Sequence, residues 1–278
     1  MKSGLQTITA KCVVRNYARH WAAFRQPPSG SPKWVSGDYE PAQYSTRNGY
    51  EKPRRADEEQ SRELMHGHYA SISYIDAQVG RILEALKVRN LYENTLVVLT
   101  SDHGFHDGEH GYWGKHNLWD ASLSVPLLIR LAGGHHDSIT SDKAIGSHVT
   151  ALTEHVDIYP TLCDLCGLAK PDWLEGDSLL PLIEDPGRPW KQAVFAHRKH
   201  MWHDRLKVYD IAHTVRTGRY RYSEYLDGKG EVLYKELFDY REDPLEEENR
   251  AERPEYACII EELTGMIKRG WQAFRPKN

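Results

Sequence analysis

The feature that most constrains the fold is an amphipathic segment that is followed, after a short turn, by a fully apolar segment. From Asp57 to about Val88, apolar residues recur at three- and four-residue steps, the period of one helix face. They are Ile72, Ile75, Val79, Ile82, Leu83 and Leu86. Asp57 can cap this helix, with Gln60 at capping-box spacing. The next run, TLVVLTSD, is apolar without alternation, which is typical of a strand buried on both faces. Helix, short turn and buried strand together predict an α/β unit.

Later segments extend this unit and then change in character. Residues 125–131 predict a neighbouring strand that continues a parallel layer, and residues 156–168 predict a helix ended by Gly167. Alternating segments separated by TGRY and DGKG predict a small antiparallel sheet, in which RTGRYRYSEY forms a hairpin with one solvated face. Residues 254–274 predict an amphipathic terminal helix that docks on the body. The predicted fold class is α/β, with a mostly parallel central sheet, a small C-terminal antiparallel sheet and a terminal helix.

Composition and hydrophobic pattern divide the chain into three parts. They are an irregular segment 1–56, rich in Pro, Gly and charged residues, an α/β core 57–190 and a small α+β part 191–278. With 278 residues and 40% hydrophobic content it can bury a substantial core. A net charge of -4 gives no electrostatic reason to expect nucleic acid or an anionic membrane as a partner. The apolar runs are far shorter than the roughly 20 residues of a membrane helix, and the first residues do not form a secretory signal, so the compartment stays open.

The densest group of chemically versatile side chains directly follows the predicted strand, in TSDHGFHDGEHGYWGKH (100–116). In open α/β sheets, ligands bind at the carboxyl ends of strands. Asp102 and His103 lie at such an end, and a carboxylate oxygen beside an imidazole nitrogen can ligate a divalent cation. Gly104 allows a sharp turn there. Lys115 could meet an anionic group bound at the cation, and His116 could transfer a proton near neutral pH.

The stretch SDHGFHDGEHGYWGKH, followed by LWDASLSVPLLI, resembles the sulfatase family of the alkaline phosphatase superfamily, most closely the branch that contains iduronate-2-sulfatase. The similarity extends from HYASISYIDAQVGRILEAL, through VDIYPTLCDLCGL and LEGDSLLPLIEDP, to VRTGRYRYSEY and ELFDYREDPLEEENRA. It implies an alkaline-phosphatase-like sandwich and hydrolysis of small-molecule or saccharide sulfate esters.

The resemblance also implies roles for individual residues. Asp102 and His103 would ligate a divalent cation, Ca²⁺ by analogy with the family, and Lys115 would contact the sulfate. We expect His116 to act beside Lys115 in catalysis. The residues expected to line the substrate pocket are Phe105, His106, Glu109 and His110.

Two features of the family are not found in this sequence. Sulfatases make a formylglycine nucleophile from the cysteine or serine of a CxPSR-type motif near the N-terminus, and an early pair of aspartates completes their metal site. The first cysteine of this chain, Cys12, lies in KCVVRNY and is not followed by the Pro-Ser-Arg of that motif. We therefore expect a chain that corresponds to the C-terminal part of a sulfatase, binds its cation weakly and is inactive alone. Its crevice should be open on one side, with exposed apolar strand surface that a complementary N-terminal fragment would cover.

Two other interpretations stay open. Phosphonate monoester and phosphodiester hydrolases of the same superfamily also carry an Asp-His pair at this strand. The absence of CxPSR equally fits a truncated, non-catalytic fragment or a partner subunit.

Overall fold

The computed structural model describes residues 28–31, 57–133, 146–199 and 211–276, and the predicted irregular segment 1–56 lies largely outside them. Helix α2 (Glu58–Val88) confirms the first predicted element. The Asp57 carboxylate accepts the backbone N–H of Gln60 at 2.8 Å, and the Gln60 side chain accepts the backbone N–H of Asp57 at 3.1 Å. The predicted capping box is therefore present, and it satisfies N–H groups that have no partner inside the helix.

Strand β1 (Val97–Thr100) follows a short 3-10 helix, η4 (Tyr92–Asn94), and pairs with strand β4 (Leu127–Arg130). The predicted neighbouring strand is confirmed, but its predicted parallel direction is wrong, because the register is antiparallel. A parallel pair needs a crossover, usually a helix, that carries the chain back to the starting edge. The chain between β1 and β4 forms only short elements and returns from the end of β1. These elements are β2 (His106–Asp107), η5 (Glu109–Gly111), β3 (Trp113–Gly114) and α3 (Asp120–Leu123).

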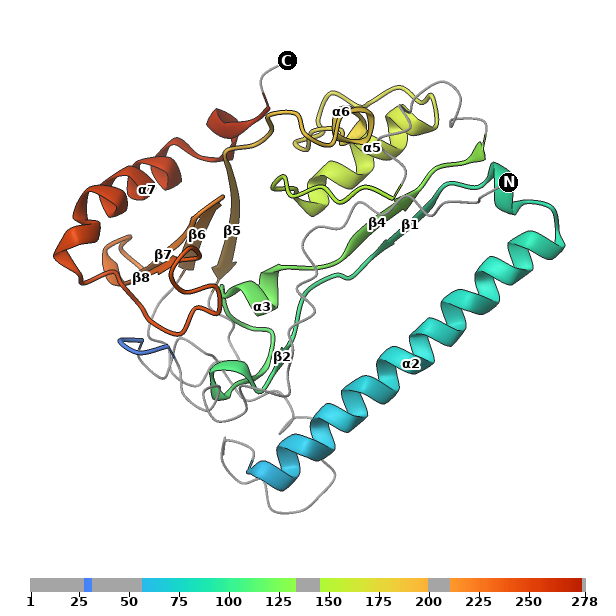
Figure 1. Ribbon diagram of the computed structural model, residues 1–278. Helices are drawn as coiled ribbons and strands as arrows, with labels where there is room; N and C mark the ends of the chain where they lie inside the picture. Colours follow the sequence, from blue (N-terminus) through green and yellow to red (C-terminus); the bar gives the residue numbers. More distant parts are fainter. Residues whose placement is uncertain (1–27, 32–56, 134–145, 200–210, 277–278) are drawn as a thin grey trace.

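One core joins this strand pair to two helices. The predicted helix at 156–168 is present as η7 (His155–Asp157) and α5 (Ile158–Leu165), and α6 (Leu180–Glu184) follows. In Figure 1 the β1–β4 pair lies between α5 and α6 on one side and the long helix α2 on the other. The buried residues shared by β4, its flanks and the two helices are Leu127, Ile129, Leu131, Val149, Leu165, Leu179, Leu182 and Ile183.

The C-terminal sheet confirms the predicted antiparallel unit. Its strands are β5 (Ala193–Lys199), β6 (Ile211–Thr217), β7 (Tyr220–Leu226) and β8 (Val232–Asp239), in that order. The predicted terminal helix is present as α7 (Ala257–Arg269), with η8 (Pro254–Tyr256) before it and η9 (Trp271–Phe274) after it. Helix α7 covers one face of the sheet, and the other face packs on Leu118 and Trp119.

Strand β7 is consequently buried on both faces. The predicted solvated face of the RTGRYRYSEY hairpin is therefore wrong, since Arg221 and Ser223 point to the side that packs against the loop before β4 and are both buried. An alternating polar pattern marks a solvated face only when no other element covers it. Here the covering element comes from a distant part of the chain.

Helix α2 shows the opposite behaviour, because its apolar stripe is largely uncovered. Ile72, Ile75 and Ile82 are 53%, 56% and 63% exposed, although their spacing is that of a core-facing stripe. Ser61, at the start of the helix, is its one buried residue among those described. Exposed apolar surface was expected on the strands beside an open crevice. No residue of β1 is fully buried, contrary to the predicted strand buried on both faces, and its Leu99 is 41% exposed. The larger uncovered apolar stripe lies on α2 instead.

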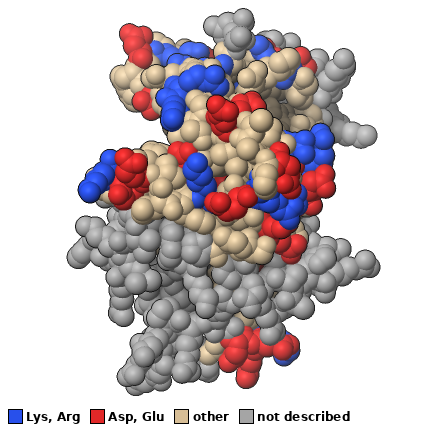
Figure 2. All heavy atoms as spheres, turned by 90° about the vertical axis from the view of Figure 1, so that its left-hand side faces the viewer, with Lys and Arg blue, Asp and Glu red and all other residues tan. Residues whose placement is uncertain are grey.

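The described part of one face carries charges of both signs. Figure 2 shows the face at the left of Figure 1, where acidic and basic side chains are interspersed among uncharged ones. Among the helices that the structure describes, none is both long and apolar enough to span a bilayer.

Candidate functional site

Asp102 and His103 lie just past the C-terminal end of β1, where the chain leaves the sheet. The distance between His103 Nε2 and Asp102 Oδ2 is 3.3 Å, and their side chains are 38% and 84% exposed. His103 Nδ1 is 2.8 Å from the carbonyl oxygen of Gly104; since a carbonyl can only accept, Nδ1 carries the proton. The other ring nitrogen, Nε2, faces the Asp102 carboxylate. One carboxylate oxygen and one imidazole nitrogen thus converge on one solvent-accessible point.

The carboxylate of Asp102 is held in its charged form. Desolvation is the largest single influence and opposes ionisation, but the charge of His103, backbone N–H groups and the Ser101 hydroxyl together lower the pKa of Asp102 below its usual value. The backbone N–H of His103 donates to Oδ1 at 3.0 Å. Oδ1 is therefore engaged within the loop, and Oδ2 is the oxygen on the imidazole side.

A small hairpin lies between this pair and Lys115 along the chain. Strands β2 and β3 are antiparallel, with His106 opposite Gly114. Phe105 precedes β2 and Lys115 follows β3, so the two residues flank the paired positions, and Phe105 is two positions from His103. The neighbouring His116 is partly buried, and its backbone N–H donates to the Tyr112 hydroxyl at 3.3 Å.

Gly104 is required at its position by the approach of α3. A Cβ built on Gly104 would lie 2.0 Å from the carbonyl oxygen of Ala121 and 3.0 Å from that of Ser124. The backbone N–H of Gly104 donates to the carbonyl of Ser122 at 2.8 Å. The glycine thus serves close packing of α3 against the Asp102–His103 turn as well as the turn itself.

The residues expected to line the substrate pocket divide into two groups. Phe105 is partly exposed, and its ring lies 6.0 Å from the His68 ring on α2. His106, Glu109 and His110 are buried, so in this arrangement their side chains lie in the protein interior. They build the loop instead: Nε2 of His110, for example, donates to the carbonyl of Leu245 at 2.9 Å.

Sequence reasoning missed a buried carboxylate, Asp107. Its side chain is 9% exposed, and His68 Nδ1 lies 3.2 Å from its Oδ1. Burial, and to a smaller extent the nearby Glu109 carboxylate, raises the pKa of Asp107 to about 7. Burial also lowers the pKa of His68, with Glu109 opposing that shift. No periodic pattern pairs residue 68 with residue 107, because the contact depends on how α2 passes the hairpin.

Two family models match the chain: the model named Sulfatase matches residues 20–168, and that of the C-terminal region of N-sulphoglucosamine sulphohydrolase matches residues 108–272. The chain belongs to the sulfatase family. The predicted resemblance is thereby confirmed.

Individual relatives agree with this assignment. The choline-sulfatase of Rhizobium meliloti (strain 1021) is 33% identical over 201 residues, which cover 71% of this chain and 35% of the relative. The iduronate 2-sulfatase of Mus musculus is 28% identical over 259 residues, covering 74% of this chain and 47% of the relative. The chain therefore spans less than half the length of these sulfatases.

Solved structures show the same fold. A protein in complex with its substrate D-glucosamine-2-N,6-O-disulfate is 29% identical, with a TM-score of 0.63 over 74% of this chain and 40% of that chain. A phosphonate monoester hydrolase from Silicibacter pomeroyi is 25% identical, with a TM-score of 0.68 over 84% of this chain and 46% of that chain. The predicted α/β fold of the alkaline phosphatase superfamily is confirmed.

The donor set fits part of a metal site. In the ranges that the structure describes, no group of three or more His, Cys, Asp and Glu side chains is placed to hold a metal ion. Asp102 and His103 supply two donors, and the Nδ1–H bond to a backbone carbonyl is the usual second contact of a metal-binding histidine. The residues fit two positions of a coordination shell.

Proposed function

We propose that the site at the end of β1 serves the hydrolysis of sulfate esters, with Asp102 and His103 as cation ligands. The observation that carries the proposal is their solvent-accessible pair, with the imidazole tautomer fixed by the Gly104 carbonyl. A divalent cation, Ca²⁺ by analogy with the family, would neutralise negative charge on the sulfate when bound there. The reaction adds water across the sulfur–oxygen ester bond and releases an alcohol and hydrogen sulfate.

The short hairpin between His103 and Lys115 supports roles for the chain's own groups. Lys115 directly follows β3, and its ammonium group would attract the anionic oxygens of a sulfate held near His103. His116 is the neighbouring group that can give a proton to the departing alkoxide, since imidazole titrates near neutral pH. Phe105, partly exposed on the same edge, would contact the organic part of a small-molecule or saccharide ester.

The nucleophile and the remaining cation ligands would come from a complementary N-terminal portion of the sulfatase architecture. Two facts support this part of the proposal: the relatives are more than twice as long as the stretch they share with this chain, and the α2 stripe is uncovered. Apolar surface of this kind is normally covered in a folded domain. A formylglycine-bearing portion that packs on α2 would bury Ile72, Ile75 and Ile82.

Cation binding tests the site without requiring turnover. Titration calorimetry of the full chain with Ca²⁺ should give weak binding, in about the millimolar range, because two protein donors leave most of the shell to water. Asp102→Asn and His103→Gln should abolish it. Asp172→Asn, which removes an exposed carboxylate elsewhere, is the matched control and should bind like the parent chain. Unchanged binding in the two site variants would remove the cation assignment.

A sulfatase assay tests whether the chain needs a complementary N-terminal part. The chain alone should leave 4-methylumbelliferyl sulfate intact, and addition of the N-terminal part of a sulfatase, with matured formylglycine, should restore hydrolysis. Turnover by the chain alone would contradict the complementation proposal. A mixture that binds the cation and assembles, yet stays inactive, would favour a non-catalytic partner subunit.

Phosphonate monoester hydrolysis is the second candidate, because a phosphonate monoester hydrolase is among the structural neighbours. The same mixture assayed with a phenylphosphonate ester separates the two. A higher kcat/KM for the phosphonate than for the sulfate would favour this alternative.

A further inference from the structure

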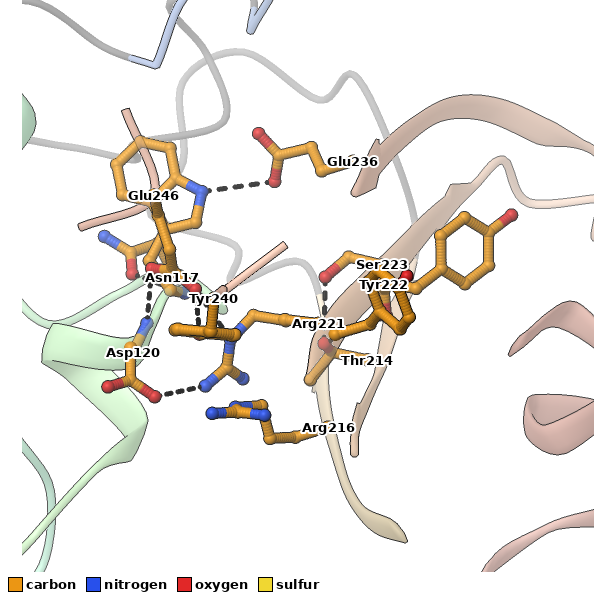
Figure 3. Close-up of polar contacts among 12 residues, drawn as sticks. Asn117, Asp120, Thr214, Arg216, Arg221, Tyr222, Ser223, Glu236, Tyr240 and Glu246 are labelled. Carbon is orange, nitrogen blue, oxygen red and sulfur yellow. Dashed lines mark hydrogen bonds and ion pairs between the residues drawn. The ribbon is translucent and has the colours of Figure 1, made fainter. Parts of the chain in front are cut away.

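A buried ionic cluster joins α3 to the C-terminal sheet. The Arg221 side chain, 4% exposed, donates from Nη2 to Asp120 Oδ1 at 2.6 Å and from Nε to Glu246 Oε1 at 2.8 Å. Glu246 Oε2 accepts the backbone N–H of Asp120 at 2.8 Å. Figure 3 shows Arg221 reaching from β7 to Asp120, with Tyr240 beside Glu246. Two segments that are distant from α3 in the sequence, one carrying Arg221 and the other Glu246, thus contact Asp120, the first residue of α3.

The cluster is built for fixed geometry. Buried charges are tolerated when they are paired and hydrogen-bonded, and the planar guanidinium here bridges two carboxylates at once. Glu246 has a φ of 58°, a left-handed conformation that non-glycine residues seldom adopt. Such a backbone persists only where its surroundings hold it, so the placement of this carboxylate is strongly constrained. The Arg216 guanidinium lies 3.7 Å from the centre of the Tyr240 ring and adds a second cation beside the two carboxylates.

Helix α3 connects the cluster to the candidate site from two directions. On one side it packs so closely on Gly104 that no Cβ fits between Gly104 and Ala121. On the other, the segment from Lys115 runs directly into α3 through Trp119, whose indole N–H donates to Glu236 Oε2 at 3.2 Å. The turn that carries Asp102 and His103 and the end that carries Lys115 therefore both depend on the position of α3.

We propose that Arg221 is a positioning residue of the candidate site. By holding Asp120 against Glu246 it fixes α3 against Gly104, and in this way the C-terminal sheet sets the placement of His103 and Lys115. The inference rests on the proposed function for its meaning, but its geometry is tested without a sulfate ester. It predicts that the C-terminal sheet belongs to the working site even though Arg221 itself meets neither cation nor substrate.

The experiment compares four variants of the full chain, of which Arg221→Lys is the conservative one. Arg221→Met removes the bridge, and Asp120→Asn weakens its α3 end while leaving the Arg221–Glu246 pair intact. Arg219→Met is the matched control, because Arg219 binds Asp239 with two hydrogen bonds, at 2.8 and 2.6 Å, at the edge of the same sheet. Two readouts follow the site: hydrogen exchange of peptides within 102–119, and the rate at which Lys115 reacts with an amine-specific reagent.

Positioning through Asp120 predicts a localised effect. Arg221→Met and Asp120→Asn should each raise exchange in 102–119 and labelling of Lys115 at least tenfold, with peptides of α5 changing less than twofold. Arg221→Lys, which keeps the charge but not the two-pronged geometry, should restore part of the protection. Arg219→Met should leave Lys115 labelling within twofold of the parent chain.

The opposite results overturn the inference. Asp120→Asn with unchanged exchange and labelling would do so even if Arg221→Met failed to fold, and so would a uniform rise across all peptides. If the variants change exchange and labelling as predicted while the complemented parent chain shows no sulfatase activity, the result counts against the proposed function and not against the positioning role.

Discussion

Replacement of Gly104 by alanine is the sharpest test of how the site is built. The new Cβ would lie 2.0 Å from the Ala121 carbonyl oxygen and 2.9 Å from its carbon. Both atoms belong to backbone, so no side-chain rotation relieves the clash. Either α3 moves away from the end of β1 or the Asp102–His103 turn opens.

The expected cost follows from overpacking. Extra methyl groups in well-packed cores cost about 1 to 3 kcal/mol, and a clash with backbone belongs at or above the upper end of that range. We expect Gly104→Ala to lower the free energy of unfolding by about 3 kcal/mol, which corresponds to a fall in Tm of about 6 to 12 °C for a chain of this size. Urea unfolding followed by tryptophan fluorescence suits the measurement, because Trp113 and Trp119 are buried beside the loop.

A second glycine supplies the control. A Cβ on Gly80, within α2, would meet nothing within 4 Å. Gly80→Ala should therefore stabilise the chain by as much as about 1 kcal/mol through helix propensity. If Gly104→Ala unfolded within about 0.5 kcal/mol of the parent chain, the close approach of α3 to the site would be refuted.

Three further perturbations have definite outcomes. Burial and Glu109 raise the pKa of Asp107 from 3.8 to about 7, so the stability of the folded chain falls as pH rises from about 4 to 7 and this carboxyl is forced to ionise. Asp107→Asn should therefore have little effect on the free energy of unfolding at pH 4 and should raise it at pH 8 by as much as about 4 kcal/mol. Urea unfolding at the two pH values checks this. Lys191→Met leaves the buried Asp157 carboxylate without the cation that contacts it, since Lys191 Nζ lies 2.6 Å from Asp157 Oδ1. It should lower the free energy of unfolding by about 3 to 5 kcal/mol in the same assay at pH 7. Ile82→Ser should change stability by less than about 0.5 kcal/mol, because the side chain is 63% exposed, yet should weaken association with an N-terminal sulfatase portion in a pull-down.

Local patterns predicted the elements and the Asp-His pair well. The period of α2 and its capping box involve residues within one or two helical turns, and the backbone geometry of a helix forces such residues together. Asp102 and His103 are adjacent in sequence and follow a strand, so their proximity needed no knowledge of the remaining chain. The antiparallel C-terminal sheet was likewise predicted from alternation and turn residues.

Contacts between distant residues could not be predicted in this way. Arg221 and Asp120 are 101 positions apart, and neither lies in a pattern that distinguishes a buried ion pair from two solvated charges. The polar residues His106, Glu109 and His110 have the composition of a binding loop, but the fold turns them inward against Trp119 and the carbonyl of Leu245.

The sequence by itself therefore determined the main helices and strands, the family and the position of two cation-ligand candidates, because each depends on short-range periodicity or on contiguous motifs. Tertiary structure alone decided the antiparallel direction of β4, the burial of the loop histidines, the exposure of the α2 stripe and the bridge from Arg221 to α3. Side-chain period fixes which residues share a face, whereas the path of the chain decides what that face meets. The same alternating or helical stripe is core when another element covers it and surface when none does.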